Sequence, residues 1–298
     1  MLVKEQVEKG DSRIIRNITV VAQGGGMVTA YHAGVVRAIG EQFGFSKIKR
    51  IVASSGSAAL YAYLVSGQTN LIEPIWYYLL ESGRFIDPWH HKRGRGIINI
   101  DFLVDNAIRE RYPLNLDSFR KSPIAFDIGV TETETGQSMF FSKNAHLDPH
   151  QLLRASCAIP YFYGKHVDLA GRQYCDGTIG DIVGLSQIGD DSKVLVVLTR
   201  PDRPIRKLLL ARRMLRWLLL RNEPLALQEK IWGMPTEYDL LNQHIAAFSK
   251  GRSVCVIRPQ QQLPMWRIDT RIQKLAATIE QGYRDTMNTA GLDAWWTA

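Results

Sequence analysis

The sequence predicts an α/β fold in which helices cover a mainly parallel sheet. Asn17 to Ala22 is a short apolar run typical of a buried strand, and residues 49–53 form a second one. A helix-compatible segment from Met27 to about Phe43 lies between them, so the three elements form a βαβ unit with parallel strands. The continuous apolar run from Lys193 to Thr199 suits a central parallel strand.

The rest of the chain continues this alternation of helical and strand patterns. Further elements are predicted as helices at residues 70–81, 101–111, 149–156 and about 269–287, and as strands at 124–131, 138–141 and 254–257. No internal repeat, low-complexity tract or interdomain linker interrupts the pattern. We therefore expect one α/β domain over residues 1–298.

The composition is that of a globular protein with ample material for a core, since 45% of the 298 residues are hydrophobic. No apolar run approaches the ~20 residues that a membrane-spanning helix needs. The charged stretch of residues 1–13 lacks the apolar region of a secretory signal. Three cysteines in so long a chain favour a reducing compartment over a disulfide framework. These features predict a cytoplasmic protein.

The basic residues are concentrated in one segment, which we call the cationic segment. Residues 200–221 contain eight basic residues and one acidic residue, a net charge of +7 out of the total of +8. At helical spacing, leucines gather on one side of this segment and most arginines on the other. The candidate membrane-binding residues are Arg206, Arg212, Arg213, Arg216 and Trp217.

Such a helix is expected to dock on an anionic membrane surface, with the protein peripheral at the inner membrane. The alternative is a helix that packs its leucines on the sheet and leaves its arginines in solvent. Nucleic-acid binding is disfavoured, because the segment is rich in leucine and has no interspersed aromatic residue beyond Trp217.

A serine stands where a predicted strand turns sharply into a helix, in the stretch Val52-Ala53-Ser54-Ser55-Gly56-Ser57-Ala58-Ala59-Leu60. In a nucleophile elbow the serine occupies strained backbone, and its neighbours must be small. If Ser55 is the centre, Ala53 and Ser57 replace the glycines of the usual G-x-S-x-G pattern. Ser54 and Ser57 are competing candidates for the nucleophile. An ordinary loop and helix N-cap is the alternative interpretation.

Three consecutive glycines, Gly24, Gly25 and Gly26, follow the first strand. Glycines allow the backbone to approach a ligand closely, and N–H groups beside a helix N-terminus favour negative charge. An ester hydrolase needs such donors as an oxyanion hole. A dinucleotide-binding turn is disfavoured, because Val28 and Thr29 stand where its third glycine belongs.

Asp176 and Gly177 end a strand-like run at residues 171–175. The sequence around Ser55 identifies no histidine partner, so a carboxylate within hydrogen-bond reach is the candidate base, provided that the site is desolvated. The alternative is an Asp-Gly hairpin turn. His146 and His150 are disfavoured as metal ligands because Pro149 interrupts the helix that would align them. We expect no metal and no organic cofactor.

These motifs, in this order, resemble those of the patatin-like phospholipases, bacterial lipid acyl hydrolases with a Ser–Asp dyad, and especially of their YjjU-like predicted-esterase branch. Gly24 to Gly26 match the oxyanion glycines and Ser55 matches the nucleophile. Asp176-Gly177 matches the Asp-Gly motif that carries the catalytic aspartate. The resemblance extends from about residue 17 to residue 290. Supporting matches are Gly34-Val35, Gly67-Gln68, RASCAIP at residues 154–160 and LVVLTRP at residues 195–201.

The resemblance implies a patatin-type three-layer α/β/α fold and hydrolysis of an acyl ester of a phospholipid or lysophospholipid through an acyl-serine intermediate. Acyl-chain length, headgroup and oligomeric state are left open by these motifs. Three departures stand out: the missing elbow glycines, Thr178 in place of the family's second glycine after the aspartate, and Val28-Thr29 in place of a basic residue and glycine. The alternative is therefore a catalytically silent module that binds lipid or a protein partner.

Overall fold

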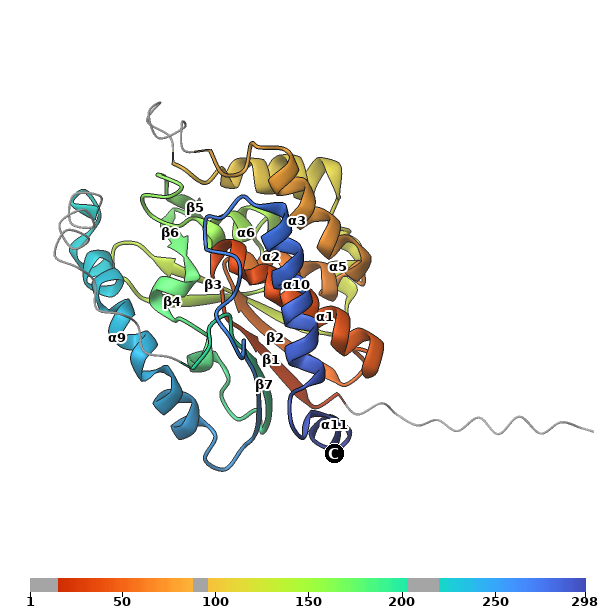
Figure 1. Cartoon of the computed structure of the whole chain (residues 1–298). Coiled ribbons are helices and arrows are strands. Elements are labelled where there is room, and N and C mark those ends of the chain that lie inside the picture. The colour runs from red at the N-terminus through yellow and green to blue at the C-terminus, as the bar shows by residue number, and fades with distance from the viewer. Residues whose placement is uncertain (1–15, 88–95, 203–219) are drawn as a thin grey trace, which may run out of the picture.

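The computed structural model describes residues 16–87, 96–202 and 220–298 (Figure 1). Within these ranges, eight strands form one sheet with helices on both faces. Five neighbouring strands are parallel, in the order β3-β2-β1-β7-β8. Their bounds are β1 (Ile18–Ala22), β2 (Ile48–Ser54), β3 (Ala125–Glu132), β7 (Lys193–Val197) and β8 (Ser253–Ile257). The predicted parallel sheet is confirmed.

Three antiparallel strands complete the sheet beyond β3. Strands β4 (Ser138–Ser142) and β6 (Arg172–Asp176) both pair with β3, and β5 (Val167–Leu169) pairs with β6. The turn between β5 and β6 is Ala170-Gly171, where both residues have positive φ, 54° and 83°. The hairpin interpretation of Asp176-Gly177 is thus wrong, because Asp176 ends a strand that leads into α7 (Gly177–Gly180).

One face of the sheet is covered by the helices around α1 (Ala30–Gln42), which follows β1 through η1 (Gly26–Thr29) as the βαβ prediction requires. Helix α10 (Ile272–Met287) lies side by side with α1 (Figure 1). Glycines permit this close approach, since a Cβ on Gly34 would lie 1.9 Å from the carbonyl oxygen of Ile279. A Cβ on Gly282 would lie 2.0 Å from that of Tyr31.

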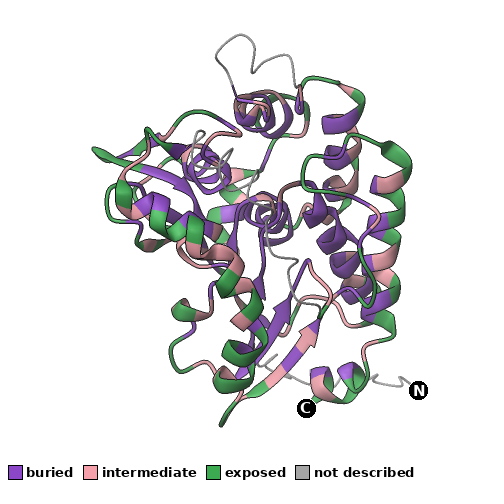
Figure 2. Ribbon diagram, turned by 60° about the vertical axis from the view of Figure 1, so that its left-hand side comes forward, coloured by how far each residue is buried: buried purple, intermediate pink, exposed green. Residues whose placement is uncertain are grey.

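The other face is covered by α9 (Leu225–Phe248), so the fold has three layers, α/β/α. Leu241 and Ile245 of α9 join the apolar cluster that contains Val21 and Val196 from this side of the sheet. Helix α9 was not predicted, and few of its residues are buried. Figure 2 shows the central strands buried and the outer faces of the helices exposed.

The other predicted helices are present, with small shifts at their ends. They are η2 (Thr69–Leu71) with α3 (Ile72–Glu81), η3 (Phe102–Arg111), α6 (Pro149–Cys157) and α10, of which η3 is a π-helix. The helix expected after the elbow, from Ala58 to Ser66, is present as α2 (Gly56–Val65). The structure adds α5 (Leu116–Lys121), η4 (Leu185–Gln187) and α11 (Leu292–Thr297). None of the helices described is long and apolar enough to cross a membrane. Arg206, Arg212, Arg213, Arg216 and Trp217 lie outside the described residues.

Candidate active site

Ser55 lies between β2 and α2 in strained backbone. Its φ of 60° and ψ of −143° place it in a region that non-glycine residues rarely adopt. Such a conformation costs on the order of 1–3 kcal/mol and persists only where the surroundings fix it. Ser54 ends β2 and Ser57 lies in α2, and neither has a positive φ. The local geometry of a nucleophile elbow is therefore centred on Ser55.

Two other serines hold the elbow in place. The backbone N–H of Ser55 donates to Oγ of Ser156 at 2.9 Å, and this hydroxyl donates to the carbonyl oxygen of Gly129 in β3 at 2.7 Å. The Ser57 hydroxyl lies 2.9 Å from the carbonyl oxygen of Ala22 and 2.7 Å from that of Ser54. Ser57, which replaces an elbow glycine, thus ties the elbow to the end of β1.

Asp176 reaches Ser55 because their two strands pair with the same edge of β3 and end next to each other. Ser54, at the end of β2, pairs with Gly129, and Asp176, at the end of β6, pairs with the next residue, Val130. Because β4 pairs with residues 127–131 and so occupies the other edge of β3, β2 and β6 share one edge. A Cβ on Gly129 would lie 2.2 Å from Oγ of Ser54, so only glycine fits there. The sheet therefore sets Ser55 and Asp176 at the same level.

The Asp176 carboxyl is 1% exposed and has one unused oxygen. Its Oδ1 accepts hydrogen bonds from the N–H and the hydroxyl of Thr178, at 2.9 and 2.5 Å. Its Oδ2 is buried and has no hydrogen-bond partner in the described part of the chain. The Ser55 hydroxyl is close enough to interact with the carboxylate, although no hydrogen bond of standard geometry joins them. Catalytic hydrogen bonds often tighten only when substrate binds.

Burial raises the pKa of Asp176 above its ordinary value, because the charged carboxylate loses solvation. Interactions with Ser55, Thr178 and the more distant Arg267 oppose this shift. A raised pKa makes the carboxylate a stronger base. The environment of Asp176 thus suits the removal of a proton from a neighbouring hydroxyl.

The three glycines lie against the elbow. A Cβ on Gly24 would lie 2.8 Å from Cβ of Ser55, and Gly26 has a φ of 62°. In the described ranges, the N–H groups of Gly24, Gly25 and Gly26 form no hydrogen bond, whereas that of Met27 donates to the Arg267 carbonyl oxygen at 3.0 Å. The N–H groups of these three glycines are therefore free to donate hydrogen bonds to a ligand.

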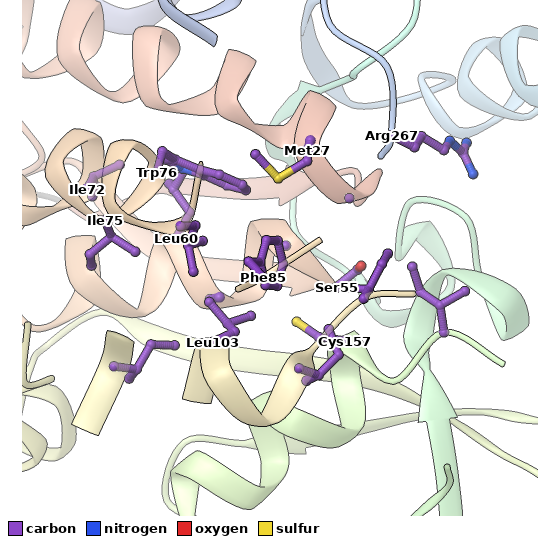
Figure 3. Close-up of a pocket in the computed structure, with 18 of the residues that line it drawn as sticks. Met27, Ser55, Leu60, Ile72, Ile75, Trp76, Phe85, Leu103, Cys157 and Arg267 are labelled. Carbon is purple, nitrogen blue, oxygen red and sulfur yellow. The ribbon is translucent and has the colours of Figure 1, made fainter. Parts of the chain in front are cut away.

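Ser55 stands between two pockets. The first has an almost wholly apolar lining (Figure 3). Its lining includes Met27, Leu60, Ile72, Ile75, Trp76 and Phe85. The second is more polar, with Asp176, Thr178, Tyr161 and Arg267 among its lining residues. An extended molecule bound at Ser55 would thus meet an apolar environment on one side and a polar one on the other.

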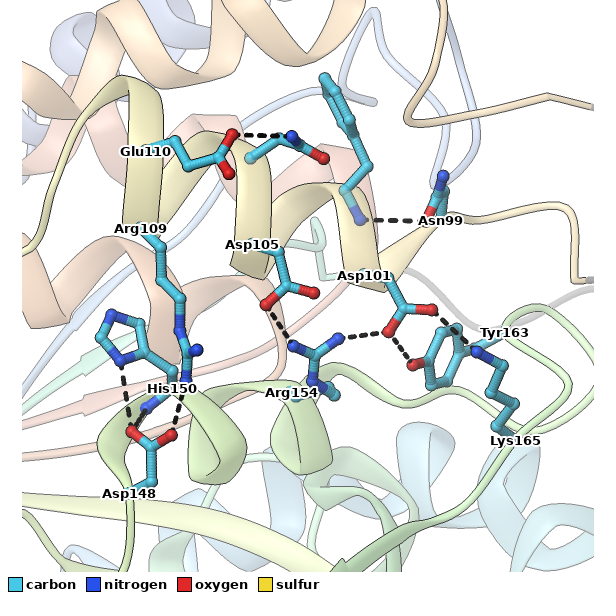
Figure 4. A network of polar contacts seen from close by, with 12 residues as sticks. Asn99, Asp101, Asp105, Arg109, Glu110, Asp148, His150, Arg154, Tyr163 and Lys165 are labelled. Carbon is cyan, nitrogen blue, oxygen red and sulfur yellow. Dashed lines mark hydrogen bonds and ion pairs between the residues drawn. The ribbon is translucent and has the colours of Figure 1, made fainter.

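A charged network anchors α6, the helix that carries Ser156. Arg154 of α6 forms ion pairs with Asp101 and, at 2.7 Å, with Asp105 of η3 (Figure 4). Tyr163 and Lys165 also donate to Asp101. The RASCAIP block, noted only as part of the resemblance, therefore contains the residue that holds the elbow. The sequence interpretation assigned no role to Ser156 or Arg267, since Arg267 belongs to no motif.

His32 and Cys175, which also lie near the motifs of the sequence, are buried residues of the fold. His32 is buried, its Nε2 lies 2.9 Å from the Gln23 carbonyl oxygen, and burial lowers its pKa to about 4, so it is neutral. Burial raises the pKa of the Cys175 thiol, which packs among apolar side chains. No group of three His, Cys, Asp or Glu side chains suited to a metal is found in the described ranges.

Comparison with known proteins places the chain in a family. The patatin-like phospholipase family model matches residues 20–187. The uncharacterized protein YjjU of Escherichia coli (strain K12) is 28% identical over 214 residues, which cover 67% of this chain and 57% of YjjU. The chain thus spans less than two thirds of the length of this relative.

Two solved structures align with nearly the whole chain. VipD from Legionella pneumophila has a TM-score of 0.49 and 14% identity, with 94% of this chain and 67% of VipD covered. The type III effector protein ExoU has a TM-score of 0.42 and 14% identity, with 95% and 54% covered. The family model matches more than half of the chain. The match includes Gly24 to Gly26, which we call the glycine loop, and also Ser55 and Asp176. The chain therefore belongs to the patatin-like phospholipase family.

Proposed function

We propose that the protein is a serine hydrolase that cleaves an acyl ester of a phospholipid or lysophospholipid through a dyad of Ser55 and Asp176. Family membership supports lipid hydrolysis in general. The observation that carries the proposal is the strained elbow at Ser55 within interaction distance of the buried Asp176 carboxylate, whose Oδ2 has no hydrogen-bond partner among the described residues. The free glycine N–H groups beside them support it further.

In the proposed reaction, Ser55 Oγ attacks the ester carbonyl carbon while Asp176 Oδ2 takes the hydroxyl proton. The N–H groups of Gly24 to Gly26 bind the carbonyl oxygen as it becomes negative. The bond to the alcohol oxygen then breaks, and Asp176 gives the proton to that oxygen. A water molecule, deprotonated by Asp176, attacks the acyl-serine. The fatty acid leaves, and the proton returns to Ser55.

The apolar pocket suits the acyl chain. Its lining is almost wholly apolar, and it opens at Ser55, where the ester carbonyl must lie. Each methylene group buried there contributes about 0.8 kcal/mol. Substrates with longer acyl chains are therefore expected to bind more tightly until the pocket is full. Trp76, Ile72 and Ile75 lie farthest from Ser55 among the labelled lining residues (Figure 3).

The test is release of fatty acid from a lysophospholipid by wild type and three serine variants. We expect Ser55→Ala to lose activity, by about 10³-fold or more, because the nucleophile is removed. Ser54→Ala and Ser57→Ala should retain a measurable rate. Activity in Ser55→Ala together with inactivity in either control would contradict the choice of Ser55. No release by folded wild type from any acyl ester would instead favour the catalytically silent lipid- or protein-binding module.

We also propose that residues 1–298 form one domain and that the enzyme contacts anionic membrane surfaces peripherally. The net charge of +7 in residues 200–221 supports this contact. Two exposed apolar side chains beside the second pocket also support it. Trp266 is 67% exposed, and Ile268, a lining residue of that pocket, is 40% exposed. An aromatic and an aliphatic side chain so placed suit the headgroup region of a bilayer.

A further inference from the structure

The glycine loop of this chain carries no cation near the oxyanion position. Val28 and Thr29 occupy the positions where the family pattern has a basic residue and a glycine. Both side chains are buried, and the Thr29 hydroxyl donates to the carbonyl oxygen of Gly26 at 2.6 Å. These residues stabilise the loop itself, so an anionic substrate group would need a cation from elsewhere.

Arg267 lies at this loop although it comes from a distant part of the chain, beyond residues 20–187 of the family match. Its carbonyl oxygen accepts the hydrogen bond from the Met27 N–H at 3.0 Å. A Cβ on Gly26 would lie 2.7 Å from the same oxygen. The backbone of Arg267 is therefore fixed against the loop, and the residue lines both pockets.

The guanidinium of Arg267 is held by a neutral partner. Its Nη2 donates to the Tyr238 hydroxyl at 3.0 Å, and it lies 5.5 Å from the centre of the Tyr238 ring. Arg200 packs over the same ring at 4.7 Å. In the part of the chain that the structure describes, no carboxylate forms an ion pair with Arg267. A guanidinium has five N–H donors, so most of them remain available.

The position of Arg267 relative to Ser55 indicates which part of a substrate it meets. In Figure 3 the apolar side chains extend from Ser55 toward Ile72 and Ile75, whereas Arg267 lies on the opposite side of Ser55. An acyl chain in the apolar pocket therefore directs the alcohol part of the ester toward the second pocket and Arg267. In a glycerophospholipid this alcohol carries a phosphate, the anion that a guanidinium binds best.

We propose that Arg267 binds the phosphate of the leaving alcohol and so gives this enzyme its preference for acyl esters whose alcohol bears a phosphate. The inference rests on the proposed function, because it takes the ester to lie at Ser55. It assigns a recognition role to Arg267 and leaves the bond-breaking steps to Ser55 and Asp176.

The test is a binding measurement in the Ser55→Ala protein, which cannot turn over the ligand. Two monomeric ligands with the same lauroyl chain are compared at pH 8 and low salt, lysophosphatidylglycerol and monoacylglycerol. Arg267→Gln should weaken binding of the phosphate-bearing ligand by about tenfold or more, as loss of a charge-assisted hydrogen bond implies. Binding of the monoacylglycerol should change by less than about twofold, since it offers no charge to Arg267.

Three further variants make the comparison specific. Arg267→Lys keeps the charge and should restore part of the lost affinity, and it also serves if the Gln variant folds poorly. Arg120→Gln changes the same charge at an exposed position on α5 and should leave both affinities unchanged. Tyr238→Phe removes the neutral partner and should retain most of the phosphate affinity.

Equal weakening of both ligands by Arg267→Gln, or of neither, would overturn the assignment. The result is independent of catalysis. If folded wild type released no fatty acid from either ester, the hydrolase proposal would fail, while the selective loss of phosphate affinity would still decide the role of Arg267.

Discussion

The hydroxyl of Ser55 lies within interaction distance of the buried Asp176 carboxylate, although the strands that carry these residues do not pair with each other. Both strands pair with the same edge of β3, where the adjacent residues Gly129 and Val130 bring their ends together. The pairing of both strands with β3 thus determines where the two side chains lie. The conformation of Ser55 depends instead on the hydrogen bonds around its turn.

Asp176→Asn should abolish ester hydrolysis without unfolding the protein. Asparagine can still accept from Thr178 through its carbonyl oxygen but cannot act as a base. Burial raises the folded-state pKa of Asp176, so its ionised form costs stability at any pH above the ordinary carboxyl pKa. The variant should therefore melt at the same or a higher temperature than wild type at pH 7 to 8, and the difference should shrink as the pH falls. A collapsed melting curve would make Asp176 a structural residue.

The rate should also depend on pH through Asp176. Since the base must be ionised, kcat/KM should fall with decreasing pH through the pKa of Asp176, which lies above the ordinary value of 3.8. Arg267 lowers this pKa, so Arg267→Gln should move the acidic limb to higher pH even for an uncharged ester. The pH profiles of kcat/KM for both proteins on a monoacylglycerol test this expectation. Coincident profiles would show that Arg267 does not influence the pKa of Asp176.

Ser156→Ala should impair catalysis because it removes the acceptor for the Ser55 N–H. A buried N–H without a partner costs about 1–3 kcal/mol, and the strained turn loses part of its support. We expect a lower melting temperature and a kcat reduced by about tenfold or more, with little change in KM. Ser66→Ala, which removes a buried serine hydroxyl at the far end of α2, is the matched control. If both variants lost only stability, Ser156 would have no positioning role.

The cationic segment should govern attachment to membranes. Replacement of Arg206, Arg212, Arg213 and Arg216 by glutamine should weaken co-sedimentation with anionic vesicles, since each basic residue near such a surface contributes roughly 1 kcal/mol. The effect should be small on zwitterionic vesicles and should diminish in high salt. A variant with the same charge change at the exposed Arg111, Arg120, Lys121 and Arg284 is the control. Equal binding of all proteins to both vesicle types would leave this segment without a membrane role.

Much of the parallel sheet could be predicted because its strands are continuous apolar runs, such as Ile18–Ala22 and Lys193–Val197, buried on both faces. Gly24 to Gly26 and Ser55 could be selected because they follow strands β1 and β2, and Asp176 because it ends strand β6. Helix α9 could not be predicted, since few of its residues are buried and Pro235 interrupts its pattern. Helix η3 was predicted as a helix, but periodicity does not distinguish its π-helical winding.

The parts of the site that escaped sequence analysis depend on contacts between distant residues. Ser156 acts through a hydrogen bond to the Ser55 backbone, and Arg267 meets the glycine loop through its own carbonyl oxygen. Neither contact leaves a pattern of residue types or spacing. The role of Ser57 at the position of an elbow glycine also depends on such contacts, because its hydroxyl lies beside the carbonyl oxygens of Ala22 and Ser54.

The central claim, that Ser55 is a nucleophile activated by Asp176, is tested most directly by labelling the folded protein with a fluorophosphonate and mapping the modified residue by mass spectrometry. We expect a single modification on Ser55, retained in Ser54→Ala and Ser57→Ala, much slower in Asp176→Asn and absent from Ser55→Ala. Labelling of another serine, or no labelling of folded wild type, would contradict the account.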